Sequence, residues 1–513
     1  MIIFFDLNVI YVQRYWPVFI KAVQQIPFVR RQDGSLAERK FSAGEVLDLV
    51  SKHKAKFVDL QFSDVPGRMQ HVTIPAEMLT EKTFTEGVSK LDGSSIRGFT
   101  EIYESDMLLM PDPSSFGFVP WSDENLRTCR MICDVHWGFG KQRFSRDVRY
   151  VAEKAVDALK KEGFSNSLWG PEVEFFVFDN VTWNVNDPFG ASYKISSKES
   201  ALETRGLSFP IRFKEGYYPA PPVDTLMEFR SQCSLYLWEG FGIASDAHHH
   251  EVATAGQCEI DLYRDNLIAM ADSILTYKYV IKNVASRNGL IATTMPKPIY
   301  GDNASGMHVA SSLWKGDRNE FHDPQDQYAE LSQLGRYYVG GLLEHSRALC
   351  AIVAPTTNSY RRLVPGYEAP VYIAWSRRNR SANVRIPVYE KGKEAEGAKR
   401  AEFRTPDTSA NPYLAFAAIL CAGLDGIRKK IDPGNPVDED IYKLTPDRRR
   451  ELNVGDLPGS LAESIESLKS DSEFLKGVFS NDLIETIIDI GMQGHRMVSA
   501  RPHPYEFYLY FDI

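Results

Sequence analysis

The sequence predicts an α+β fold in which a large mixed sheet is backed by helices. Strand-like and helix-like segments alternate through residues 144–513 without an internal repeat. Residues 170–178 (GPEVEFFVF) form an aromatic and β-branched run after a Gly-Pro break, which is typical of a buried strand. At 513 residues the chain is too long for one ordinary core, so at least two domains are expected.

The composition is that of a globular protein that binds neither nucleic acid nor membranes. Hydrophobic residues make up 43% and charged residues 25%, and the net charge of −9 disfavours polyanionic partners. No apolar run reaches the ~20 residues that a membrane span needs. The six cysteines form no Cys-x-x-Cys pair and no framework spacing, so reduced thiols in a cytoplasmic protein are expected.

Residues 1–35 are interpreted as an N-terminal extension, followed by one domain at 36–143 and a second at 144–513. The extension is apolar and aromatic, but it lacks the basic start and the small-residue cleavage site of a signal peptide. A short docking helix and an upstream start codon are the two interpretations. Within the first domain we expect a helix in 41–54, a hairpin of strands 57–62 and 69–74, a loop at 91–96, and strands at 107–113 and 129–136.

The second domain begins with a helix that we expect Ser145 to cap and Gly163 to end. Further helices are predicted from a cap at Asp265 to Asn288, over 328–352, and from Asn411-Pro412 to about 430. Strands are predicted at 295–300 and 306–313, a polar loop at 388–399, and a charged surface segment at 432–450.

Two carboxylates, Glu172 and Glu174, lie on one face of the central strand, separated along it by roughly 6.8 Å. One interpretation is a surface strand whose Glu side chains point to water. The other is that both side chains are buried and line a functional site, because buried carboxylates need a positive partner.

Further candidate ligands lie elsewhere in the chain. Glu251 and Glu259 flank a predicted turn, while His308 and Glu402 each fall in a separate segment. The three consecutive histidines 248–250 are at least as consistent with a solvated or packed run as with a metal site. Five Glu and one His form an oxygen-rich set that suits two Mg²⁺ or Mn²⁺ ions.

Arginines concentrate between residues 361 and 404. They are Arg361, Arg362, Arg377, Arg378, Arg380, Arg385, Arg400 and Arg404. Solvated arginines paired with the excess acid are one interpretation. The other is a pocket for phosphate and carboxylate groups, which arginine binds bidentately, and arginine with divalent cations is typical of phosphoryl transfer.

Over residues 40–513 the sequence resembles the bacterial and archaeal type I glutamine synthetase family. The motifs that carry the resemblance are 91–96 (LDGSSI), 104–107 (ESDM), 170–175, 249–259, 306–308, 358–370 (NSYRRLVPGYEAP), 378–381 (RNRS) and 400–404. The resemblance implies an N-terminal β-grasp domain and a large catalytic domain. It also implies ATP-dependent ligation of ammonia to L-glutamate through γ-glutamyl phosphate, in a cytoplasmic dodecamer of two hexameric rings with active sites between subunits.

The resemblance also implies roles for individual residues. Glu174, Glu251 and Glu259 would hold the metal near glutamate, and Glu172, His308 and Glu402 the metal on ATP. Arg362, Arg404 and Asn303 would bind glutamate, while Arg380, Arg385, Arg400 and Asp246 would face the phosphates and nucleotide. Glu368 would lie on a flap over the intermediate, and a neighbouring subunit would supply Asp92 to bind and deprotonate ammonium.

Four positions depart from the family pattern. Ala304 replaces a usual glycine, and Asp246 replaces a glutamate on the nucleotide side. Ala310 replaces a histidine that contacts the nucleotide, and Gly397 replaces a lysine near ATP. Tyr442 falls near the family's adenylylated tyrosine but has different neighbours, which favours an ordinary surface tyrosine. Two alternatives remain: a γ-glutamyl ligase for amines or polyamines, which Asp92 and Glu368 disfavour, and a catalytically silent structural or regulatory homologue, which the complete ligand set disfavours.

Overall fold

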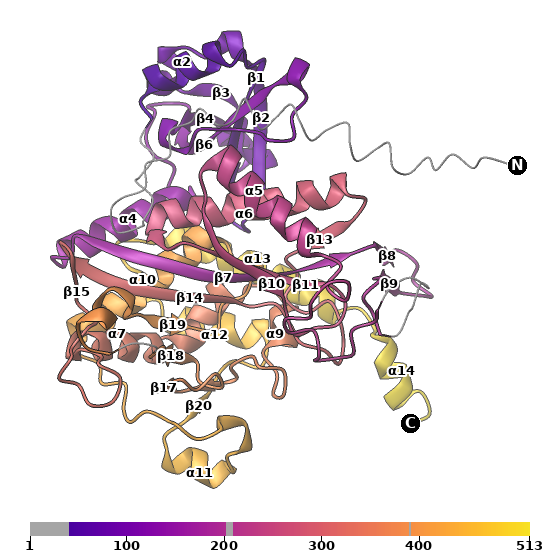
Figure 1. Ribbon diagram of the computed structural model, residues 1–513, viewed down its shortest axis with the longest axis vertical. Coiled ribbons are helices and arrows are strands. Elements are labelled where there is room, and N and C mark those ends of the chain that lie inside the picture. Colours follow the sequence, from indigo (N-terminus) through magenta and orange to yellow (C-terminus); the bar gives the residue numbers. More distant parts are fainter. Residues whose placement is uncertain (1–40, 202–208, 389–390) are drawn as a thin grey trace, which may run out of the picture.

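The computed structural model describes residues 41–201, 209–388 and 391–513, so the predicted extension at 1–35 lies outside the described residues. A small N-terminal sheet stands on one side of a much larger sheet, and helices lie between and around them (Figure 1). Among the described residues, no helix is both long enough and apolar enough to cross a membrane.

The N-terminal sheet has the order β2-β1-β6-β4-β3, with β5 paired to β6. Its strands are β1 (Phe57–Ser63), β2 (Met69–Pro75), β3 (Val88–Asp92), β4 (Asp106–Pro111), β5 (Gly117–Phe118) and β6 (Thr128–Trp137). The predicted β1–β2 hairpin is confirmed, and β1 also runs parallel to β6. Helices α2 (Ala43–Lys52) and α3 (Glu81–Glu86) accompany the sheet, and Ser42 and Glu45 form a capping box on α2. The predicted loop at 91–96 is partly wrong, because its first two residues end β3.

The large sheet has the order β10-β11-β7-β14-β19-β18-β17, with β12 and β13 also paired to β7 and β15 to β14. Its strands are β7 (Asn166–Phe178), β10 (Ser245–His250), β11 (Gln257–Leu262), β12 (Asp265–Asn266), β13 (Ile291–Thr293), β14 (Met307–Lys315), β15 (Arg318–Asn319), β17 (Trp375–Arg377), β18 (Val384–Ile386) and β19 (Ala401–Phe403). The predicted strand at 170–178 is therefore the centre of this sheet. Two small ribbons pair β8 (Asn180–Asn184) with β9 (Ser192–Ser196), and β16 (Tyr372–Ile373) with β20 (Gly455–Asp456).

Most helices of the second part of the chain pack around the large sheet. They are α4 (Val148–Lys161), α5 (Met227–Phe241), α6 (Leu267–Arg287), α7 (Gln333–Glu344), α8 (Ser346–Val353), α9 (Ser359–Arg362), α10 (Pro412–Lys429), α11 (Pro446–Glu451), α12 (Leu461–Ser470), α13 (Asn481–Ser499) and α14 (Pro504–Tyr510). Helix α10 starts where predicted, because Asn411 caps it, and it is buried along most of its length. Its position at the centre of the helical layer explains its apolar character on all sides.

Several predicted boundaries are wrong. Asp147, not Ser145, caps α4, and Asn266, not Asp265, caps α6. The predicted helix over 328–352 is two helices that meet at His345, whose ring is held by carboxylates from two other elements. Residues 295–300 form no strand; the strand of this region is β13. Part of the predicted loop at 388–399 is a 3₁₀ helix (Gly392–Ala398), and α11 lies in the predicted surface segment.

Candidate functional site

Two groups of metal-ligand side chains lie on neighbouring strands of the large sheet. Each group offers three ligand atoms that lie within 4.8 Å of one another. The first group is Glu172, His308 and Glu402; the second is His249, Glu251 and Glu259. The described residues contain no other group of this kind. Five of the six members of the two groups were predicted.

Strand register assembles the first group. Glu172 on β7 and His308 on β14 are cross-strand partners, and His308 Nδ1 lies 3.2 Å from Glu172 Oε2. Glu402 on β19 faces the residue two positions beyond His308. Burial and the nearby Arg404 hold the pKa of His308 well below its ordinary value, so its imidazole is neutral, the form that binds metals.

Glu402 is also where the arginine cluster meets the first group. Its side chain is 1% exposed and accepts hydrogen bonds from Arg385 Nη1 at 2.7 Å and Arg404 Nη1 at 2.6 Å. Glu172, in contrast, has a side chain that is 43% exposed. The first group is therefore closed and basic at Glu402 and open to solvent at Glu172.

The second group forms on β10, β11 and the turn that connects them. His249 is the cross-strand partner of Glu259, which in turn faces Glu174 on β7. The two ring nitrogens of His249 lie 3.7 Å from Glu251 Oε1 and 3.7 Å from Glu259 Oε2. His249 thus belongs to this group although it was not singled out. The alternation of side chains along a strand could have identified it, because alternation places His249 on the opposite face from His248 and His250.

Glu174 lies beside the second group and is held there by hydrogen bonds. Its carboxylate accepts from Gln257 Nε2 at 2.9 Å and from the Gly306 amide at 3.0 Å. Gln257 also donates to the carbonyl of Ala304. The predicted trio was Glu174, Glu251 and Glu259. In the structure His249, Glu251 and Glu259 form the group, and Glu174 lies next to it. Gln257 is a functional candidate that the sequence did not reveal.

The acidic residues of the second group fit a divalent cation. Burial raises the pKa of Glu174, Glu251 and Glu259; the charge of Glu251 further raises the pKa of the other two, and that of Glu174 raises the pKa of Glu259. Among the described residues, no lysine or arginine forms an ion pair with any of the three. Buried carboxylates without a cation are costly, and an oxygen-rich donor set suits Mg²⁺ or Mn²⁺. The observed residues therefore match the chemistry of such an ion.

Other predicted residues line the same region. Arg362 is buried, and its guanidinium donates to the carbonyls of Arg404 and Thr405. A Cβ at Gly306 would lie 2.7 Å from Arg362 Nη2, so glycine is required for this approach. Asn303 Nδ2 lies 3.4 Å from Glu368 Oε2. Glu368 has φ +60°, a left-handed conformation that costs energy for a residue other than glycine.

Arg380 is exposed, and its charge helps to lower the pKa of His308, with a smaller effect than burial, Arg404 and Arg362. Tyr442 is not the ordinary surface tyrosine that was predicted. Its hydroxyl donates to the carbonyl of Ala369, next to Glu368, at 2.7 Å, and burial raises its pKa to about 12. Tyr442 therefore anchors the segment that carries Glu368.

The structure does not bring every predicted residue into contact with the two groups. Asp92 is exposed in the N-terminal sheet, and its carboxylate accepts hydrogen bonds from Ser94 and Ser95 of its own loop. Asp246 is exposed on β10, beside a local irregularity in strand register. Arg400 Nη1 donates to the Ala398 carbonyl.

The other three of the four substituted positions lie in identifiable places. Ala304 provides the carbonyl that Gln257 bonds, as described above. Ala310 on β14 is the cross-strand partner of Glu402, next to the first group. The carbonyl of Gly397 accepts a hydrogen bond from Arg264. Ala310 is thus the substitution closest to the first group.

Comparisons with known proteins agree with this geometry. The family model described as "Glutamine synthetase, beta-Grasp domain" matches residues 54–138, and "Glutamine synthetase, catalytic domain" matches residues 145–510. The glutamine synthetase of Sulfolobus acidocaldarius is 53% identical over 470 residues, which cover 91% of this chain and 98% of that protein. That of Frankia alni is 47% identical over 481 residues, covering 92% and 99%.

Solved structures show the same likeness. The electron cryomicroscopy structure of Plasmodium falciparum glutamine synthetase superposes with a TM-score of 0.82 at 26% identity. The superposition covers 92% of this chain and 99% of that one. The similarity therefore extends over both sheets described above.

Proposed function

This chain belongs to the glutamine synthetase family, and we propose that it joins ammonia to L-glutamate at the two ligand groups, with ATP as the co-substrate. The predicted family, two-part fold and glutamate–ammonia ligase class are confirmed by the comparisons. The observation that carries the proposal is that two complete ligand groups and the arginine cluster meet on one sheet.

In the proposed reaction the side-chain carboxylate of glutamate takes the γ-phosphoryl group of ATP. Ammonia then displaces phosphate from the resulting γ-glutamyl phosphate. Both substrates are anions, so the site must offset their mutual repulsion. Two divalent ions, Mg²⁺ or Mn²⁺, held by the two ligand groups and Glu174, would supply positive charge to the phosphates and to the glutamate carboxylate.

Arginines supply the remaining positive charge. We assign Arg362 and Arg404 to the α-carboxylate of glutamate and Asn303 to its amino group. Both guanidinium groups are buried and fixed by hydrogen bonds, which supports a binding role because a preorganised donor loses little entropy. Arg380 and Arg385 would contact the transferring phosphoryl group and the ATP phosphates.

On the nucleotide side we place two further predicted residues, Asp246 and Arg400. Asp246 is exposed on β10, and Arg400 lies one residue before β19, which carries Glu402. Arg400 is thus near the first ligand group along the chain. The assignment of both residues follows from the family motifs.

Ammonium would be bound and deprotonated by Glu368 and by Asp92 of a neighbouring subunit. Hydrogen bonds from Ser94 hold the pKa of Asp92 below its ordinary value, so it is ionised and suited to a small cation. Glu368 lies on the segment that Tyr442 anchors, and that segment would close over the acyl phosphate and exclude water.

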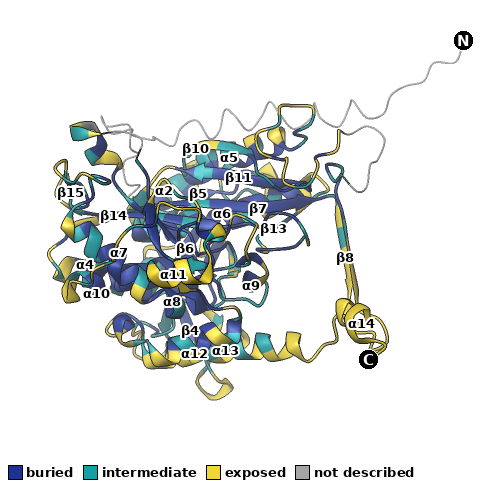
Figure 2. Cartoon of the chain, turned by 90° about the horizontal axis from the view of Figure 1, so that it is seen from below, coloured by how far each residue is buried: buried dark blue, intermediate teal, exposed yellow. Residues whose placement is uncertain are grey.

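A requirement for Asp92 from a second subunit implies an oligomer, which we propose to be a dodecamer of two hexameric rings in the cytoplasm. The C-terminal helix α14 supports self-association. Its residues and those after it are all exposed, they include five aromatic side chains from Tyr505 to Phe511, and the helix projects from the body (Figure 2). Exposed apolar surface of this kind is typical of an interface.

We place the domain division between residues 143 and 144.

The proposal is tested by phosphate release from ATP with glutamate, comparing ammonium, alkylamines and no amine. We expect release with ammonium, and little with alkylamines or without amine. Release with an alkylamine but not ammonium would identify a γ-glutamyl-amine ligase instead. No release, together with no ATP binding in Mg²⁺, would identify a catalytically silent homologue. A Glu402→Gln variant is the control for release by a contaminating enzyme.

A further inference from the structure

A cavity of about 410 Å³ lies where the N-terminal sheet meets helices α4 and α6. None of its lining residues belongs to the two ligand groups described above. Strand β6 and the segment after β4 form one wall, and the first turns of α4 and the N-terminal half of α6 form the others. Its volume is in the range of small-molecule pockets.

Arg130 on β6 lines this cavity and lacks most of the hydrogen bonds that a buried guanidinium needs. The residue is 3% exposed. Its Nη2 donates to Thr276 Oγ1 at 2.7 Å, and the guanidinium carbon lies 4.5 Å from the centre of the Phe241 ring. Nε and Nη1 have no hydrogen-bond partner among the described residues. Unpaired donors on a buried charge are costly, so this arginine is suited to an anionic group.

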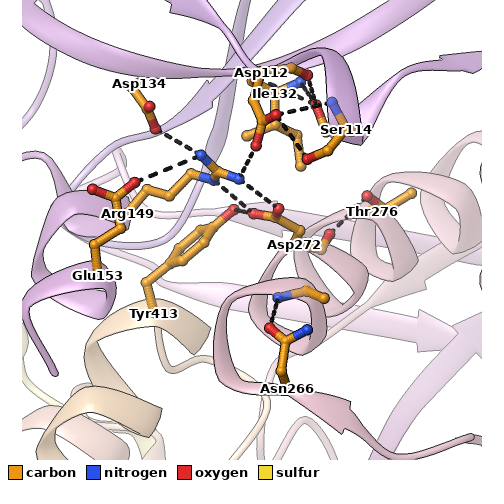
Figure 3. Close-up of polar contacts among 12 residues, drawn as sticks. Asp112, Ser114, Ile132, Asp134, Arg149, Glu153, Asn266, Asp272, Thr276 and Tyr413 are labelled. Carbon is orange, nitrogen blue, oxygen red and sulfur yellow. Dashed lines mark hydrogen bonds and ion pairs between the residues drawn. The ribbon is translucent and has the colours of Figure 1, made fainter. Parts of the chain in front are cut away.

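The nearest carboxylate does not satisfy Arg130, because it is already bound elsewhere. Asp272 accepts from Arg149 Nε and Nη2, both at 3.1 Å, and from the hydroxyl of Tyr413 at 2.5 Å (Figure 3). Burial lowers the pKa of Arg130 to about 10 despite the attraction of Asp272. Among the described residues Arg130 therefore forms no ion pair, and the carboxylate of Asp272 is already bound by Arg149 and Tyr413.

The part of the cavity around Arg149 has the reverse imbalance. Arg149 also binds Asp112 and Asp134, at 2.5 Å and 2.7 Å, and lies 3.9 Å from Glu153 (Figure 3). A second arginine, Arg143, pairs with Asp134 at 2.9 Å and with Glu153 at 3.1 Å. Burial and the charge of Asp134 raise the pKa of Glu153, which is the effect expected where carboxylates outnumber cations. Asp112, Asp134, Glu153 and Asp272 thus share two arginines, Arg143 and Arg149, which leaves surplus negative charge there, whereas Nε and Nη1 of Arg130 are unpaired among the described residues.

We propose that this cavity binds a small zwitterion, with its carboxylate on Arg130 and its cationic group toward Asp112, Asp134 and Glu153. A simple anion would be repelled by the carboxylates around Arg149 and a simple cation by Arg130, whereas a molecule with both charges complements both parts of the cavity. Because β6 belongs to the N-terminal sheet and α6 to the larger part of the chain, the ligand would also join the two parts.

The test is a titration of the full-length protein, without ATP, against ω-amino acids of graded length. The probes are β-alanine, 4-aminobutyrate and 6-aminohexanoate, with butyrate and butylammonium as single-charge controls. Binding is measured by calorimetry and by the thermal unfolding midpoint, which a ligand of the folded state raises. We expect at least one zwitterion to bind about tenfold or more tightly than either control.

Variants locate the binding. Arg130→Lys removes the guanidinium fork, and Ala269→Met fills the cavity from α6 without changing a charge. We expect each to weaken zwitterion binding by about tenfold or more, while Glu402→Gln, in the other site, leaves it unchanged. If Arg130→Lys does not fold, Ala269→Met decides. Binding that survives Ala269→Met, that is lost in Glu402→Gln, or that is absent for all probes up to about 10 mM would overturn the proposal.

Discussion

Glu174 and Glu259 face each other directly across the antiparallel strands β7 and β11. Opposed carboxylates in a buried cross-strand pair are destabilising unless something positive lies between or beside them. Both residues are less than 10% exposed, at 7% and 6%. This pair therefore stores unfavourable electrostatic energy that a bound cation would relieve.

Glu172 and Glu174 are expected to serve different substrates although they are two residues apart. Glu172 contacts His308, whereas Glu174 is held by Gln257 and Gly306 beside the second group. We expect Glu172→Ala chiefly to raise the KM for metal-bound ATP, and Glu174→Ala chiefly to impair use of glutamate and ammonia. Steady-state kinetics with each substrate varied in turn measures this. The same kinetic defect in both variants would contradict the division.

Divalent cations should stabilise the protein through the second group. We expect Mg²⁺ or Mn²⁺ to raise the thermal unfolding midpoint of the wild type and EDTA to reverse the rise. Glu259→Gln should be more stable than the wild type without metal, because it removes one of the crowded carboxylates, but should lose the response to metal. A metal response that is unchanged in Glu259→Gln would exclude this group as the binding site.

Removing the Glu402 carboxylate should leave two buried arginines without the acceptor that they share. Arg385 and Arg404 both donate to it, and all three residues are buried. We expect Glu402→Ala to destabilise the protein by about 3 kcal/mol and to abolish activity, because two buried charges lose their partner. Glu402→Gln keeps an acceptor oxygen and should fold with a smaller loss. Calorimetric unfolding of both variants measures the difference, and equal stability of Glu402→Ala and the wild type would refute it.

Stability should fall with rising pH through His345. Its ring nitrogens lie 2.8 Å from Asp471 and 3.0 Å from Asp425; burial opposes the imidazolium, but the two carboxylates outweigh burial and raise the pKa of His345. A group whose pKa is higher in the folded state contributes stability that is complete below its unfolded pKa of about 6.5 and is lost as pH rises through the folded value.

The measurement for His345 is the unfolding midpoint of the wild type and of His345→Gln across this range. The difference between them should be largest below pH 6.5 and should shrink at higher pH. His136 is a matched control, since its ring bonds the Lys141 carbonyl at the exposed surface and contacts no carboxylate among the described residues. A difference that does not vary with pH would contradict the prediction.

Deleting residues 504–513 should alter assembly but not the fold of the subunit. Every residue of this segment is exposed, and α14 has no buried residue. We expect the truncated protein to keep its secondary structure and thermal transition while its mass by light scattering falls below that of the full-length assembly. An unchanged mass would show that α14 does not hold subunits together.

Local patterns predicted the elements that local forces stabilise. The alternation of residues 57–62 and 69–74 predicted the hairpin, and Asn411 with Pro412 predicted the start of α10, because caps and turns depend on a few neighbouring residues. The break at His345 was not predictable in this way. It accompanies hydrogen bonds to Asp425 and Asp471, which are 80 and 126 residues distant in sequence.

The sequence by itself determined the family, the central strand and most of the ligand set, since residues 170–178 and the motifs around them carry those patterns. Only the tertiary structure decided that His249 joins Glu251 and Glu259, that Gln257 holds Glu174, and that Arg130 lines a cavity without an ion pair. The physical reason is register. Which side chains meet depends on how strands pair across the sheet, and hydrogen bonds between strands distant in the chain leave no periodic trace in either strand.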